Sequence, residues 1–436
     1  MSFKFFFKME QKSIVRRKNN ISVVIFCLMI TGYFLSIPQL KSQEIETSEF
    51  KEYKGLVQDA KSKKSLEFAS LVVNGTNIST ITNTDGEFLL KVPQDLLGKS
   101  VTVTYLGYYN KVIPLTDFTD DKFVIKLEES FEQLPDVTLV SNDPDEIIRK
   151  LMENKGKNYV NEPMIMKGFY RESIKKRKTY ASLAEAVVDI YKQPVKSQSK
   201  DYVKLHKARK STDYKKIDTL VIKLQGGPYN NLAMDMIKNQ DLFFNSDIFD
   251  TYNFTFDKVI SMNNRTVFVV NFIQKSSVIE PFFQGKLFID TQSYALVKAH
   301  YSLNLENLKK ASEFFVKKKP SKADVIPLRT NYIVDYRTVD GKWYFGYSRI
   351  ELSFKVDWDK KLFNSQYHLT IEMAITDWQL NEADEQLKNK EKLKTNIILS
   401  DKASGFSNPE FWGEYNVIEP DKSIENAIKK IQRKQK

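Results

Sequence analysis

The chain has 436 residues, of which 42% are apolar and 28% charged, and its formal net charge is +12. Half of that excess lies in residues 1–43, which hold seven Lys/Arg and one Glu, so the other 60 basic and 54 acidic residues form an ordinary solvated surface. This balance excludes a nucleic-acid-binding protein on charge. The length and apolar content predict two or three soluble globular domains with a sizeable core.

The N-terminus has the pattern of a secretory signal peptide. Basic residues between positions 12 and 18 precede an uncharged, largely apolar run over residues 21–37, and Pro38 and a polar stretch follow. We predict a signal peptide over residues 1–42, cut near Ser42 and Gln43. An uncleaved membrane anchor is the alternative, because a run of about 17 residues is near the lower limit for a span. The single cysteine, Cys27, lies in this run, so the exported chain would lack disulfides and thiolate sites.

Residues 54–130 contain short β-rich runs separated by tight turns. Asn74-Gly75 and Asp85-Gly86 are turn dipeptides, and residues 101–105 are a short run of β-branched and aromatic residues. We expect the strands flanking Asp85-Gly86 to form a hairpin. Several strands at this spacing predict a small β-sandwich.

Three pieces of this segment carry a family resemblance: Gly55-x-Val57-x-Asp59, Thr82-Asn83-x-Asp85-Gly86-x-Phe88, and Tyr105-Leu106-Gly107-Tyr108. The segment resembles the carboxypeptidase-regulatory-like domain, an immunoglobulin-like fold common in envelope proteins of Bacteroidetes. The resemblance implies an accessory domain without peptidase chemistry and an address in the cell envelope.

A linker and a helix are predicted over residues 131–162. Residues 134–140 form a linker strand by their pattern. Asp143 can cap a helix, Pro144 suits its first turn, and Ile147, Ile148 and Leu151 fall on one face.

The pattern is β-rich again from residue 163 to residue 420. Two alternating runs, 167–174 and 179–191, flank a basic tip over residues 175–178, which predicts a hairpin. We predict further strands over residues 253–260, 266–274, 282–290, 296–303, 329–338, 342–356 and 367–378, with a turn at Asp340-Gly341 and a short helix over 232–238. Large residues alternate at Tyr332, Val334, Tyr336, Trp343, Phe345 and Tyr347, which predicts one buried sheet face. Residues 383–394 are helical or loose, and residues 421–436 form a basic amphipathic helix.

Two segments of this region resemble known families. Residues 285–291 followed by 294–297 are similar to a strand–turn–strand element of periplasmic lipoprotein carriers, which are half-open antiparallel barrels with lipid inside. Residues 409–420, with Gly168-Phe169-Tyr170-Arg171-Glu172, resemble the large uncharacterised C-terminal region of Bacteroidetes proteins that carry the regulatory-like domain. The predicted fold is mainly β: an immunoglobulin-like sandwich, then a larger antiparallel, half-barrel-like domain with a few helices.

The sequence offers no catalytic constellation. His206, His300 and His368 lack the spacing of a zinc peptidase, and the nearest approach to a nucleophile elbow, at Gly405, has Pro409 in place of the second glycine. Asp357-Trp358-Asp359 places two acids on the strand face opposite the Trp, which argues against a glycosidase pair. We therefore predict no catalytic, cofactor-binding or metal-binding residues and no cofactor.

The function predicted from the sequence is non-enzymatic binding or assembly by an exported protein, periplasmic or outer-membrane associated. Its partner would be an envelope protein, a lipid or a glycan, with peripheral membrane contact through basic groups such as residues 175–178, 317–319, 388–394 and 429–436. The alternatives are a periplasmic lipid or lipoprotein carrier and a glycan or peptide hydrolase with scattered carboxylates. Trp412, in an aromatic connector, is predicted to pack against the main β domain.

Overall fold

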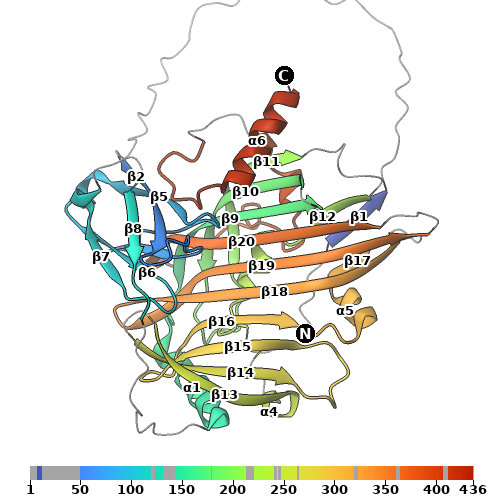
Figure 1. Cartoon of the computed structure of the whole chain (residues 1–436), viewed down its shortest axis with the longest axis horizontal. Helices are drawn as coiled ribbons and strands as arrows, with labels where there is room; N and C mark the ends of the chain where they lie inside the picture. The colour runs from blue at the N-terminus through green and yellow to red at the C-terminus, as the bar shows by residue number, and fades with distance from the viewer. Residues whose placement is uncertain are drawn as a thin grey trace, which may run out of the picture.

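The computed structural model describes residues 7–11, 50–118, 123–130, 143–177, 179–212, 220–239, 243, 247–262, 265–318, 323–359, 364–405 and 411–435. The fold is mainly β, as predicted, with a small N-terminal β-sandwich and one large open sheet (Figure 1). The predicted linker strand over 134–140 lies outside the described residues, as does most of the predicted signal peptide.

The N-terminal sandwich consists of two small sheets with a shared core. One sheet has the order β5-β2-β8 and the other β4-β3-β6-β7, and side chains such as Val57, Leu71 and Val103 are buried between them. The strands are β2 (Phe50–Asp59), β3 (Ser70–Val73), β4 (Ser79–Ile81), β5 (Glu87–Pro93), β6 (Ser100–Thr104), β7 (Lys111–Pro114) and β8 (Phe123–Leu127), with short 3-10 turns η1 (Gln94–Leu96) and η2 (Leu115–Asp117).

One of the two predicted turns is confirmed as a hairpin and the other is not. β3 and β4 pair antiparallel around Asn74-Gly75, where Gly75 has a φ of 67°. The strands on either side of Asp85-Gly86 belong to different sheets, so the expected hairpin is wrong. The turn itself is tight, with a hydrogen bond from Gly86 N to Asn83 O, but it carries the chain from one layer of the sandwich to the other. Local turn chemistry fixes the bend and leaves open which sheet each strand joins.

The large sheet has the strand order β13-β14-β15-β16-β18-β19-β20-β9-β10-β11-β21. Ten strands run antiparallel to their neighbours, and the two-residue β21 adds to β11 in parallel. The predicted strands of this sheet are all present: β9 (Met164–Lys176), β10 (Thr179–Lys192), β13 (Tyr252–Met262), β14 (Arg265–Gln274), β15 (Phe283–Asp290), β16 (Leu296–Leu303), β18 (Ala323–Val339), β19 (Lys342–Trp358) and β20 (Ser365–Leu380). Two strands were not predicted, β11 (Tyr202–Thr212) and β21 (Ser404–Gly405).

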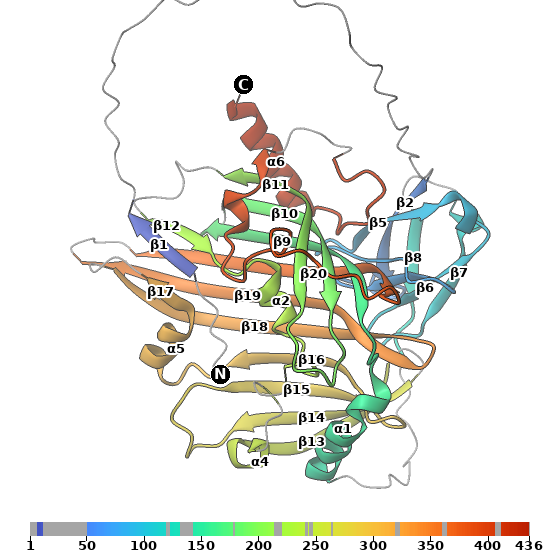
Figure 2. The same ribbon diagram turned by 180° about the vertical axis from the view of Figure 1, so that it is seen from behind.

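Helices cover one face of the large sheet and close an apolar core against it. Helix α1 (Pro144–Asn158) begins at the predicted cap, where Asp143 accepts a hydrogen bond from Asp145 N. Figure 2 shows α1 and α2 (Pro228–Leu232) in front of the sheet, while α4 (Ile248–Thr251) and α5 (Leu308–Phe315) complete the layer. Residues 232–238 were predicted as a helix, but the helix ends at Leu232. It begins earlier because Pro228 occupies its first turn after two glycines with positive φ.

The alternation predicted over β18 and β19 breaks at a β-bulge. Tyr336 pairs with Phe345 and Asp335 pairs with Tyr347, so Gly346 is the extra residue between them. Trp343 and Phe345 lie in the core under the helices, as predicted. Tyr347 faces the opposite side of the sheet, because the bulge shifts the alternation by one residue. The prediction of one face for all six residues is therefore wrong for Tyr347.

The sandwich and the C-terminal segment cover the other face of the sheet. Ile81 and Leu89 of the sandwich, with Trp412 and Ile418 of the C-terminal segment, form one apolar cluster with sheet residues including Phe169. The predicted C-terminal helix is confirmed as α6 (Lys422–Gln435), and its Ile424 packs on β10. Residues 383–394 are turns and bends without a helix.

A small three-stranded sheet contains β1 (Phe7–Gln11), β12 (Leu220–Leu224) and β17 (Val316–Lys318) in the order β12-β1-β17. β1 lies within the segment predicted to be the signal peptide, so cleavage there would remove this central strand. Within the residues that the structure describes, no helix is long and apolar enough to cross a membrane. The apolar run over 21–37 is outside those residues.

Candidate functional site

A row of alternating charges crosses the sandwich-covered face of the sheet. Each side chain is the register partner of the next, on five neighbouring strands. In spatial order from β11 to β19 the members are Arg209, Glu185, Arg171, Glu372 and Arg349; we call this row the charge ladder. Opposite charges placed directly across strands stabilise the pairing, and here the arrangement repeats across four strand pairs.

The ladder is buried and its contacts are short. Glu185 has no exposed surface, and it accepts hydrogen bonds from Arg171 Nε at 2.7 Å and Arg209 Nε at 2.8 Å. Burial by itself raises the pKa of Glu185, but the two guanidinium groups outweigh burial and hold the pKa below its usual value. At the other end, Glu372 lies 3.4 Å from Arg171 Nη1 and 2.8 Å from Arg349 Nη1.

The sandwich is fastened over this face by buried hydrogen bonds. Ser79 donates to the carbonyl of Ile375 at 3.1 Å and accepts from Arg337 Nη1 at 2.6 Å. The main chain of Lys91 makes two bonds with the Asn416 side chain, at 2.7 and 3.0 Å. The sandwich, the sheet and the C-terminal segment are thus tied together across one seam.

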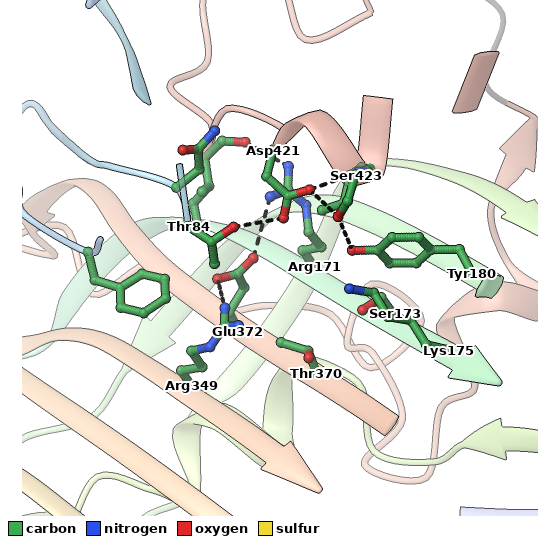
Figure 3. A pocket seen from close by; sticks show the side chains of 14 residues that line it. Thr84, Arg171, Ser173, Lys175, Tyr180, Arg349, Thr370, Glu372, Asp421 and Ser423 are labelled. Atoms are coloured by element: carbon green, nitrogen blue, oxygen red, sulfur yellow. Dashed lines mark hydrogen bonds and ion pairs between the residues drawn. The ribbon is translucent and has the colours of Figure 1, made fainter. Parts of the chain in front are cut away.

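A polar pocket opens at this seam beside the ladder (Figure 3). Its cavity has a volume of about 140 Å³, enough for one small polar group of a ligand. The sheet supplies the floor and two walls come from the sandwich and the start of α6. The lining residues are Phe68, Asn83, Thr84, Arg171, Ser173, Lys175, Tyr180, Arg349, Thr370, Glu372, Ile418, Asp421, Ser423 and Ile424.

The two carboxylates of the pocket are both engaged by protein donors. Glu372 is held by two ladder arginines and by Tyr347 Oη at 3.2 Å. Asp421 accepts from Thr84 Oγ1 at 2.9 Å, from Ser423 Oγ at 2.5 Å and from the main-chain N of Ile424 at 2.8 Å. Burial raises the pKa of Asp421, yet these hydrogen bonds outweigh burial and leave the pKa below its usual value.

The groups with hydrogen-bonding capacity to spare are donors or hydroxyls. Ser173 and Thr370 are cross-strand partners on the floor, and neither side chain has a hydrogen bond to another described residue. The ammonium of Lys175 lies 4.3 Å from the centre of the Tyr180 ring and has no carboxylate partner within the described ranges. Asn83 is only 3% exposed, and its Nδ2 has no partner in that same part of the chain.

Comparison with known proteins identifies the sandwich. Residues 53–139 match the family model of the CarboxypepD_reg-like domain. The N-terminal sandwich is a carboxypeptidase-regulatory-like domain. Over 149 residues the chain is 27% identical to the TonB-dependent receptor SusC of Bacteroides thetaiotaomicron, a match that covers 32% of this chain and 14% of the receptor. Together these matches support an envelope protein of the Bacteroidetes type, with the regulatory-like domain next to a β-rich region.

Two solved structures have a low likeness to this chain. A LolA superfamily protein from Nitrosomonas europaea is 10% identical, with 58% of this chain and 97% of that chain covered and a TM-score of 0.20. A DUF1329 family protein from Desulfovibrio piger is also 10% identical, with coverage of 56% and 95% and a TM-score of 0.23. These scores are too low to carry function from those proteins to this chain.

The structure keeps the residues considered for chemistry apart. His206 bonds to Tyr415, His300 to Asn331 and His368 to Ser353, and no group of three potential metal ligands occurs among the described residues. Asp357 forms an ion pair with Lys355 at 2.8 Å at the end of β19. Trp412 is 5% exposed and packs edge-on against Phe169, which confirms the predicted anchor between the C-terminal segment and the β domain.

Two further groups of buried ionisable residues lie on the helix-covered face of the sheet. Lys192 pairs with Asp201 at 2.8 Å and with Asp235 at 2.7 Å, which ties β10 to the chain that follows α2. Glu172 is buried and accepts a hydrogen bond from Tyr170 Oη at 2.6 Å. Burial raises the pKa of Glu172 to about 7, and the hydrogen bond from Tyr170 only partly opposes this rise.

Proposed function

We propose that this chain is a non-enzymatic binding protein of the bacterial cell envelope, exported to the periplasm or the outer membrane. The regulatory-like domain and the large sheet act as one unit, and the pocket at their seam receives part of an envelope partner. The observation that carries the proposal is the pocket itself: three separate parts of the chain converge on it, and its unsatisfied donors face a space large enough for a ligand group.

The pocket does not favour the hydrolase alternative. A glycosidase needs one carboxyl group with a raised pKa as general acid and a second carboxylate free to act as base or nucleophile. Asp421 has a lowered pKa, and both Asp421 and Glu372 are already saturated by protein donors. Proton transfer from either group would first require breaking these contacts.

The interior behind the β15–β16 hairpin does not favour the carrier alternative. Tyr301 stacks on Tyr332 with ring centres 5.2 Å apart, and Phe283 and Phe243 pack edge-on or stacked around them. Leu287, further along β15, is also buried in this core. Side chains fill the place where a carrier of this type would hold an acyl chain.

Site-specific photocrosslinking in intact cells tests the proposal. A photoreactive phenylalanine would replace Phe68 in the pocket wall, Val112 on the outer edge of the regulatory-like domain, or Ile279 in the β14–β15 loop. Val112 and Ile279 are 59% and 72% exposed, so both are accessible controls away from the pocket. We expect one product of defined mass from position 68, identified by mass spectrometry as an envelope component.

Two outcomes would overturn this assignment. A product from position 112 alone would move the binding face to the outer edge of the regulatory-like domain. Turnover of cell-wall glycan or peptide by the purified protein, lost in Glu372→Gln, would make the protein an enzyme.

A further inference from the structure

We infer that the seam pocket binds a carboxylate group of its ligand, held by Lys175 at the mouth and by the floor hydroxyls of Ser173 and Thr370. This inference rests on the proposed binding function and names the chemistry of the group bound. It follows from which hydrogen-bonding groups in the pocket are already used and which are not.

The pocket contains hydrogen-bond donors without partners, whereas its carboxylates already accept hydrogen bonds from the protein. Glu372 and Asp421, the two strong acceptors, each receive two or more protein donors. The capacity that remains belongs to the Lys175 ammonium, the Ser173 and Thr370 hydroxyls and the Asn83 amide nitrogen, all without hydrogen-bond partners among the described residues. The Lys175 ammonium can only donate and both hydroxyls can donate, so a ligand with acceptor atoms satisfies all three.

The buried positions of two of these groups make the pocket a built site. Asn83 and Ser173 are 3% and 5% exposed, and a buried polar group without a partner costs stability. The Asn83 Oδ1 already accepts from the main chain of Asp85 and Glu87, which fixes the side chain and leaves its Nδ2 unsatisfied. Figure 3 shows Ser173 and Thr370 on the sheet, facing the space below Asp421 and Ser423.

Charge selects a carboxylate over a more highly charged group. Every arginine of the ladder that lines the pocket is paired with a glutamate, so Lys175 is the cation left to bind an anion. Asp421 lies in the same pocket and repels an incoming anion. A carboxylate carries one negative charge, whereas phosphate carries about 1.5 to 2 at neutral pH and would meet stronger repulsion. Charge-assisted bonds from an ammonium to a carboxylate are about twice as strong as neutral ones.

Calorimetric titration of the full chain with three small probes tests this inference. The probes are N-acetyl-alanine, its uncharged amide, and inorganic phosphate, each for wild type, Lys175→Met and Lys176→Met. Lys176 is the next residue on β9 and points to the other face, so it controls for the loss of one charge. We expect N-acetyl-alanine to bind wild type and Lys176→Met alike, and to bind Lys175→Met about tenfold more weakly.

Each other result would count against the inference. Equal binding of the acid and the amide would mean that the pocket does not recognise the negative charge. Tighter binding of phosphate, with the same dependence on Lys175, would replace the carboxylate by a phosphate group. If none of the probes binds while crosslinks still form at position 68 in cells, the carboxylate assignment fails and the binding function stands.

Discussion

The two faces of the large sheet are covered in opposite ways by the same strands. On β9, Tyr170 points into the aromatic core under the helices, while the next residue, Arg171, points into the charge ladder under the regulatory-like domain. The helix-covered face is held by burial of apolar surface, which is non-directional and tolerates rearrangement. The other face is held by directional charge pairs that depend on strand register. Because its contacts are directional, the polar face specifies how the domain and the sheet fit together.

Removal of the central ladder arginine should cause the largest loss of stability. Arg171→Met leaves Glu185 and Glu372 each without one of their guanidinium partners, and these two carboxylate side chains are only 0% and 5% exposed. Loss of one partner from a buried ion pair costs about 3–5 kcal/mol, so we expect a fall of about 4 kcal/mol in the free energy of unfolding. Urea denaturation of the full chain measures it.

Lys167→Met is the matched control for this variant. Lys167 lies on the same face of the same strand and pairs with Asp189 at 2.6 Å, but its side chain is 34% exposed. Asp189 is 12% exposed, but the lysine end of the pair reaches water, so we expect its loss to cost about 1 kcal/mol. If both variants lost the same stability, burial would not distinguish the ladder from ordinary surface pairs.

Removal of a buried acid on the helix-covered face should raise the stability of the protein, whereas removal of Arg171 should lower it. Glu172 titrates near pH 7 in the folded protein against 4.5 in the unfolded chain. Below pH 4.5 both states are protonated; between pH 4.5 and 7 the unfolded state ionises first, so stability falls as pH rises. Glu172→Gln removes this loss. We expect the variant to match wild type at pH 4 and to exceed it by roughly 3 kcal/mol at pH 8, from about 1.4 kcal/mol per pKa unit.

Melting curves at both pH values measure this difference. Glu382→Gln, on an exposed turn, controls for the loss of a negative charge. A Glu172→Gln variant that was less stable than wild type at pH 8 would mean that the carboxylate is paired and that this face is not as apolar as the core around it suggests.

The contact between the C-terminal segment and the sheet can be weakened at Trp412. Its indole packs edge-on against Phe169 at 5.6 Å and under the guanidinium of Arg209 at 4.7 Å, so it joins the C-terminal segment to the sheet. Truncation of a buried aromatic costs about 3 kcal/mol or more, and we expect Trp412→Ala to lose about 3 kcal/mol. Phe411→Ala, at the half-buried neighbour, should lose less. Ready quenching of Trp412 fluorescence by acrylamide in the folded protein would contradict the anchor.

The sequence predicted the strands of the sheet far better than the seam. Period-two alternation and turn dipeptides located β9, β10, β13 to β16 and β18 to β20, because both signals are local. The bulge at Gly346 and the crossing from β4 to β5 depend on pairing with distant strands, so Tyr347 and the Asp85-Gly86 turn were assigned wrongly.

The charge ladder was missed for the same reason. Its members are separated by up to 201 residues, as between Arg171 and Glu372, and only the strand order brings them together. A charged residue within an apolar strand is a signal in itself, and Glu185 and Glu372 each interrupt such a run. The signal indicates a buried pair without naming the partner.

The smallest expected effect concerns the turn that brings the regulatory-like domain over the ladder. Gly86 has a φ of +78°, and a Cβ there would lie 2.8 Å from the carbonyl oxygen of Val57 and 2.9 Å from Ser65 Cβ. Gly107 has a similar φ of +83°, but nothing lies within 4 Å of its Cβ position. Left-handed backbone costs a side chain about 1–2 kcal/mol. We expect Gly107→Val to lose about that much.

Gly86→Val should lose more than Gly107→Val, because the clash with Val57 adds to the same backbone strain. The loop from Asn83 to Gly86 must then shift, and it carries Asn83 and Thr84 to the pocket wall. Denaturation midpoints of the two variants separate the cost of the clash from the cost of φ. Equal losses would mean that the turn relaxes without moving its neighbours; a larger loss at Gly86, together with weaker ligand binding, would mean that this single turn sets the fit between the domain and the polar face.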